Sequence, residues 1–181
     1  MVIKLLNQLE QFEQQWPSRH QDVTIEVPTP ETTPIFLSPE GKSIPLWSTI
    51  LYYKSLRHAN IMALYNGTLI FLLQQIEDLI YSTPSFASLS TTKSFPSRIY
   101  TAGIEICRAV DYHFEHMRKG AGSFMLLWPL RMAWDAVGQH DDAVGIWLKD
   151  VLKKIEEGST GRWAIAGYLL EMNRLTNATP S

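Results

Sequence analysis

The residues of this chain best suited to nucleophilic or metal chemistry are one cysteine and two histidines. Two imidazoles spaced like His113 and His116 on one helix could share a metal ion, with Cys107 as a further ligand or as a nucleophile. The spacing argues against a joint site, because His113 on a regular helix is rotated well away from Cys107 on the apolar face. We therefore expect Cys107 to be a buried structural thiol and the histidines to have ordinary surface or capping roles.

Four charged residues lie in or beside the most apolar segments: Arg108, Asp111, Arg131 and Asp135. An unpaired charge in such surroundings would cost several kcal/mol. Three interpretations remain open. The charges are paired across a helix bundle, which is the favoured interpretation, or they line a cavity and orient a small polar ligand, or they are exposed to solvent.

Other patterns that could indicate catalysis have simpler explanations. Glu77/Asp78 and Asp141/Asp142 are adjacent pairs, and adjacent residues of a helix point in different directions. Asp141 is also placed to cap a helix. The glycine-rich residues 120–123 lack the preceding strand and the following lysine of a phosphate loop, so a turn between helices is favoured. The sequence thus predicts no catalytic residue, no metal ligand and no cofactor.

The composition predicts one globular domain without a nucleic-acid-binding surface. With 181 residues, 45% of them hydrophobic, the chain can bury one large core but not two. A net charge of −2 and basic runs no longer than a pair do not suit direct contact with nucleic acid. The single cysteine excludes an internal disulfide, so we expect a nuclear or cytoplasmic protein that is not secreted. No signal peptide and no membrane span is predicted.

The elements that position these residues are predicted to be helices within a single domain, residues 1–181. Residues 1–16 form an amphipathic helix that Pro17 ends, residues 17–45 form an extended proline-rich loop, and residues 46–176 form the helical core. Residues 23–27 alternate like a strand, but a lone strand has no partner in a helical chain. The predicted fold is all-α, an irregular array of about six helices with two long loops rich in proline, serine and threonine.

The longest predicted helix runs from near Leu46 to about Ile80, with a possible break around residues 55–58. From Ala59 to Leu73 it is apolar on almost every side, so other helices must surround it. Small Gly103 and Cys107 would let a neighbouring helix approach closely. The second loop covers residues 82–94, and further helices are predicted at residues 95–120, 124–138 with a kink at Pro129, 142–157 and 160–176.

Two segments carry a resemblance to a known family. One is LYYKSLRHANIMALYNGTLIFLL, and the other, Tyr100 to Trp134, holds an Ile-Cys-Arg-x-Val-x-Tyr-His helix, a glycine turn and an apolar helix with Trp-Pro-Leu-Arg. Over roughly Ile44 to Leu175 the chain resembles the C-terminal regulatory region of fungal zinc-binuclear-cluster (Zn2Cys6) transcription factors. The resemblance implies an all-helical regulatory domain that self-associates, contacts transcription machinery or responds to small molecules, often in the control of secondary-metabolite gene clusters.

The chain departs from that family in one respect. Family members carry six cysteines that bind two zinc ions and a basic segment that contacts DNA, whereas this chain has one cysteine. It cannot contact nucleic acid by that route. The resemblance therefore implies either a piece of a longer regulator or a free-standing protein derived from one, with a protein partner or self-association, and with a small-molecule effector as a further possibility.

We expect the partner or ligand surface to be formed by polar and aromatic side chains beside the apolar helices, since Tyr, Trp and Arg often dominate interface energy. The candidates are Tyr52, Tyr53, Arg57, His58, Arg108, Tyr112, His113, Trp128 and Arg131. Most of them would otherwise complete the core. The alternative function is a small helical enzyme or metabolite-binding protein of a biosynthetic cluster, with a pocket near Arg108, His113 and Arg131.

Overall fold

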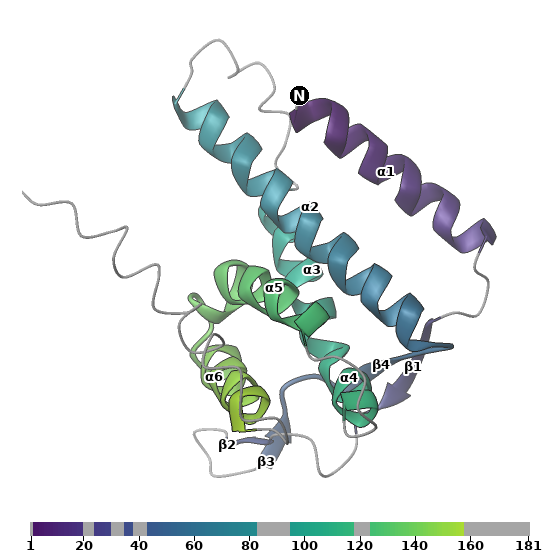
Figure 1. The fold of residues 1–181 in the computed structure, drawn as a ribbon. Helices are drawn as coiled ribbons and strands as arrows, with labels where there is room; N and C mark the ends of the chain where they lie inside the picture. The colour runs from purple at the N-terminus through teal and green to yellow at the C-terminus, as the bar shows by residue number, and fades with distance from the viewer. Residues whose placement is uncertain are drawn as a thin grey trace, which may run out of the picture.

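The structure is a computed structural model that describes residues 2–19, 24–29, 35–37, 43–82, 95–117 and 124–157. The described chain is mostly helical, as predicted, with a few short strands (Figure 1). Its elements are α1 (Val2–Arg19), β1 (Thr24–Pro28), β2 (Ile35–Leu37), β3 (Ser43–Pro45), β4 (Thr49–Tyr53), α2 (Leu56–Ser82), α3 (Phe95–Arg108), α4 (Val110–Met117), α5 (Phe124–Ala133), the π-helical turn η2 (Trp134–Gly138) and α6 (Asp142–Glu157).

Helix α2 is the centre of the molecule, which confirms the predicted buried helix. It contacts α1, α3 and α5, and Figure 1 shows α1 running alongside it in the opposite direction. Ile70 and Leu72 are both buried, although two residues apart they lie on nearly opposite sides of the helix. Phe71 is the exception to this all-round burial, with 45% of its surface exposed.

The predicted start of this helix near Leu46 is wrong, because α2 begins at Leu56. Ser55 precedes it and accepts hydrogen bonds from two backbone amides: Oγ from that of His58 at 3.4 Å, and the carbonyl from that of Ala59 at 3.1 Å. Such capping fixes where a helix starts. The expected break around residues 55–58 is therefore the true N-terminus.

The segment before α2 is a strand that pairs with a second strand from the proline-rich region. β1 and β4 are antiparallel, with Thr24 opposite Tyr53 and Pro28 opposite Thr49. The alternation in residues 23–27 did indicate a strand, and its partner is the β-branched and aromatic run of β4, which we had assigned to a helix. A second short pair joins β2 to β3. The predicted continuous loop over residues 17–45 is therefore wrong at these strands.

Other predicted boundaries also change. Helix α1 continues through Pro17 to Arg19. Proline removes one backbone donor, and here it does so close to the helix end, where few bonds follow. The predicted helix over residues 95–120 is divided at Ala109 into α3 and α4. The second loop, apart from Ser82 in α2, and the helix expected at residues 160–176 lie outside the described residues.

Helix α3 packs closely against η2 through a glycine. A Cβ atom at Gly103 would lie 2.6 Å from Cγ2 of Val137 and 3.1 Å from the Cβ of Ala136 in η2, which confirms the predicted close approach. Helix α6 follows, and Oδ1 of Asp141 accepts hydrogen bonds from the backbone amides of Ala143 and Val144 at 3.0 and 3.2 Å. This confirms the predicted cap.

Among the described residues, no helix is long and apolar enough to cross a membrane.

Candidate functional site

The nine candidate residues lie in three separate places. Arg57 and His58 are at the start of α2, and Trp128 and Arg131 are on α5. The remaining five lie around β4 and the α3–α4 junction; they are Tyr52, Tyr53, Arg108, Tyr112 and His113.

Two tyrosines, Tyr52 and Tyr53, pack against the side chain of Tyr112, which is buried. The ring of Tyr112 makes edge contacts with Tyr52 at 5.4 Å and with Tyr53 at 5.5 Å between ring centroids. The hydroxyl of Tyr52 donates a hydrogen bond to Glu115 at 3.2 Å. Burial raises the pKa of Tyr53 and of Tyr112 above the ordinary tyrosine value, so both phenols stay neutral. This cluster joins β4 to α4 and has the character of a core contact.

His113 lies beside the tyrosines and is only 2% exposed. Its Nδ1 lies 2.9 Å from the backbone carbonyl of Ala109, and because a carbonyl only accepts, Nδ1 carries the proton. Its Nε2 lies 3.2 Å from the side-chain oxygen of Asn60 on α2. Because Nδ1 carries the proton, Nε2 can only accept, and its approach to the Asn60 oxygen is a contact and not a hydrogen bond. The His113 side chain is buried between α4 and α2, so the surface or capping role expected of it is wrong.

The expected structural role of Cys107 is confirmed. The thiol is buried, and burial raises its pKa, which suppresses the reactive thiolate. Within residues 2–19, 24–29, 35–37, 43–82, 95–117 and 124–157, no three His, Cys, Asp or Glu side chains are grouped to hold a metal ion. The His116 side chain lies outside what the structure describes.

Arg108 fastens the end of α3 to the β1–β4 pair. Its Nε donates to the carbonyl of Thr49 at 2.9 Å, a terminal nitrogen contacts the Thr49 hydroxyl, and the same nitrogen lies 2.8 Å from a carboxylate oxygen of Glu26. Hydrogen bonds from Thr49 and Arg108, together with the charge of Arg108, lower the pKa of Glu26. The predicted pairing of Arg108 is thus confirmed, but the partner comes from a strand.

Arg131 forms a separate ion pair one turn along its own helix. Its Nε lies 3.2 Å from Asp135, which also accepts a hydrogen bond from Gln139 at 2.8 Å. Burial raises the pKa of Asp135 even though the charge of Arg131 opposes the shift. Arg108 and Arg131 are therefore bound to different acids on different elements.

The two residues at the start of α2 differ in role. The Nδ1 of His58 lies 2.7 Å from the hydroxyl of Ser55, so this imidazole takes part in the cap of α2. His58 is thus used in the cap, and Arg57 is exposed at the surface.

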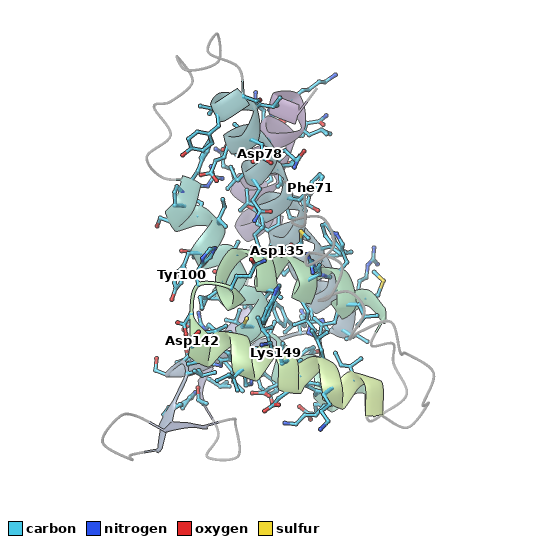
Figure 2. The ribbon with its side chains drawn as sticks, turned by 90° about the vertical axis from the view of Figure 1, so that its left-hand side faces the viewer. Phe71, Asp78, Tyr100, Asp135, Asp142 and Lys149 are labelled. Carbon is cyan, nitrogen blue, oxygen red and sulfur yellow. The ribbon has the colours of Figure 1, made fainter. Side chains whose placement is uncertain are left out.

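Trp128 is the candidate that best fits a partner surface. Its indole ring lies against α2, because a Cβ atom at Gly67 would be 2.7 Å from its Cζ3 atom, yet 39% of the side chain is exposed. Phe71 follows Gly67 by one helical turn on the same side of α2, and Met125 precedes Trp128 on α5. We name these three exposed apolar residues, Phe71, Met125 and Trp128, the α2–α5 strip. Figure 2 shows Phe71 on α2, with Asp78 further along the same helix.

A cavity of about 330 Å³ lies between α1, α2 and α3. Its walls combine apolar side chains with polar ones, and the lining residues are Phe12, Met62, Tyr65, Asn66, Leu69, Ser97, Arg98, Thr101, Ala102 and Glu105. None of the nine candidates lines it, so the pocket expected near Arg108, His113 and Arg131 is not this cavity.

Two polar contacts shape the cavity. The amide nitrogen of Asn66 donates to Glu105 at 3.1 Å, and Arg98 lies 2.9 Å from Glu10 of α1. Sequence reasoning missed this cavity. The available signals were Asn66 inside an otherwise apolar helix and the polar residues 97, 98, 101 and 105, which repeat at helical spacing on α3.

Comparisons of the chain with protein families, with curated proteins and with solved structures gave no match.

Proposed function

We propose that this chain is a regulatory and interaction domain of fungal transcriptional control, or a stand-alone protein derived from one, linked to secondary-metabolite gene control. Its placement in that class rests on the sequence resemblance to the zinc-binuclear-cluster regulators. The observation that supports an interaction role is the α2–α5 strip. Aromatic and methionine side chains are enriched at protein interfaces, and here three of them are exposed together on a well-packed pair of helices.

The proposed partner is a protein that presents an apolar helix to the strip. Phe71 and Leu79 lie two turns apart on α2, both are more than two-fifths exposed, and such spacing suits a helix packed alongside. The partner is either a second copy of the chain or a relative with the DNA-binding module. In both cases the chain acts in the nucleus through that partner and does not contact DNA itself.

The test is a reporter assay in which the full chain is fused to a six-cysteine DNA-binding module. We expect reporter output to change with the fusion and to return toward the unfused level when Phe71→Ser and Trp128→Ser are introduced together. Ile146→Ser is the matched control, because Ile146 is 61% exposed on α6, away from the strip. Equal output from the fusion and from the DNA-binding module alone would contradict the regulatory proposal.

Light scattering on the purified chain separates the two kinds of partner. A dimer that the Phe71→Ser and Trp128→Ser pair converts to monomer identifies a second copy. A monomer whose reporter effect still requires the strip identifies a different protein. A reporter effect that the paired substitution leaves unchanged would show that the strip is not the partner surface.

A second candidate function is a metabolite-binding protein of a biosynthetic cluster, and the cavity between α1, α2 and α3 favours it. Its volume of about 330 Å³ lies at the lower end of the range for small-molecule sites. The two functions are compatible, since a regulatory domain can respond to an effector.

A further inference from the structure

Asn66 is the feature of the cavity that points to a ligand. It is 3% exposed, and it is one of only two buried polar or charged residues in the described chain. Burying an amide is costly unless its polar atoms are bonded. Its position on the cavity wall gives those atoms access to a bound molecule.

The orientation of the Asn66 amide follows from its neighbour. The carboxylate of Glu105 accepts hydrogen bonds and cannot donate them, so the nitrogen of Asn66 must face it, at 3.1 Å. The amide oxygen therefore points elsewhere, and within the described residues it receives no hydrogen bond from another side chain. The Asn66 oxygen is an acceptor held ready for a donor group.

The charges around the cavity also favour a donor. Glu105 places a negative charge on the wall, and the positive charge of Arg98 is balanced by Glu10 at 2.9 Å. A carboxylate ligand would be repelled by the carboxylate of Glu105 on the cavity wall. The lining also includes Phe12, Met62 and Leu69, which suit an aromatic or aliphatic body.

We propose that the cavity between α1, α2 and α3 binds a small apolar molecule that carries one hydrogen-bond donor, a hydroxyl or a protonated amine, at Asn66. The proposal is independent of the α2–α5 strip, which lies on a different side of α2. It rests on the second candidate function, the metabolite-binding protein, and its failure would leave the interaction role of the strip untouched.

The experiment is fluorine NMR on the full chain with three probes of one size. These are para-fluorophenethylamine, para-fluorophenylethanol and para-fluorophenylacetate, which differ in the group that would meet Asn66. We expect saturable binding of the amine, the alcohol or both. The carboxylate should bind about tenfold more weakly, because the loss of one polar contact lowers affinity by about that factor. Binding of the amine alone identifies a cationic ligand, and binding of the alcohol identifies a neutral one.

Two variants test the site itself. Asn66→Leu keeps the side-chain size and removes the acceptor, so affinity should fall about tenfold. Thr101→Trp fills the cavity from an exposed position on α3 and should abolish binding. Tyr100→Trp is the matched control, because Tyr100 is exposed on the same helix outside the cavity and lies at the edge of the molecule in Figure 2.

Circular dichroism melts establish that each variant is folded, and Thr101→Trp decides the question if Asn66→Leu is unstable. The proposal is overturned if neither donor probe binds, if the carboxylate binds as tightly as they do, or if Thr101→Trp binds like Tyr100→Trp.

Discussion

Two helical glycines make contacts of nearly equal closeness in surroundings that differ completely. A Cβ atom at Gly103 would lie 2.6 Å from a methyl group of Val137, and one at Gly67 would lie 2.7 Å from the ring of Trp128. Val137 is fully buried and has no room to move, whereas Trp128 is partly exposed. The α3–η2 contact is therefore rigid, and the α2–α5 contact ends in a side chain that can adjust. An adjustable aromatic side chain at the surface suits a site that must fit a partner.

Gly103→Ala gives the largest expected effect. In an open helix alanine is more favourable than glycine by about 1 kcal/mol, but here the added methyl group meets Val137 and Ala136, which cannot shift. We expect the free energy of unfolding to fall by about 1–3 kcal/mol in urea denaturation. Thr101→Ala, at an exposed position of the same helix, serves as the control. A stabilised Gly103→Ala variant would refute the rigid contact.

Gly67→Ala gives a smaller effect. The indole of Trp128 can swing outward, and the helix gains the alanine preference, so the free energy of unfolding should change by less than about 1 kcal/mol. Acrylamide should quench the tryptophan emission more strongly, and the increase should vanish in a Trp128→Phe background. A loss of stability as large as that of Gly103→Ala would show that the two contacts are equally rigid.

Glu26→Gln gives the smallest effect, because Glu26 is exposed and its partner Arg108 only fastens the end of α3 to the strands. The pKa of Glu26 is lowered in the folded state, so its contribution is complete well above the ordinary value of 4.5 and is lost as the pH falls through the folded-state pKa. The variant should be slightly less stable than the wild type at neutral pH and equal to it in strong acid. Denaturation curves at several pH values measure the difference. A constant difference at every pH would rule out the ionised carboxylate as its source.

The sequence identified the parts of the fold that depend on burial pattern. The apolar run through Ile70 marked α2 as central, and Asp141 marked the start of α6. The prediction from sequence failed where strand pairing decides the structure. β4 is a strand because β1 pairs with it, and residues 29–48 separate the two strands in the sequence.

The candidate residues show the same division. Selection by residue type chose Trp128, which is partly exposed. It also chose Tyr112 and His113, which are buried in the core. Asn66 and the polar residues of α3 marked two faces of the cavity, but no local pattern gives the placement of the three helices that brings those faces together.

The ion pair between Glu10 and Arg98 joins positions 88 residues apart. During synthesis on the ribosome, α1 emerges before α2 and α3, which carry its docking sites. The apolar stripe of α1, which includes the buried Leu6, therefore stays uncovered until α2 and α3 have been translated, and exposed apolar surface of this kind favours aggregation of the nascent chain.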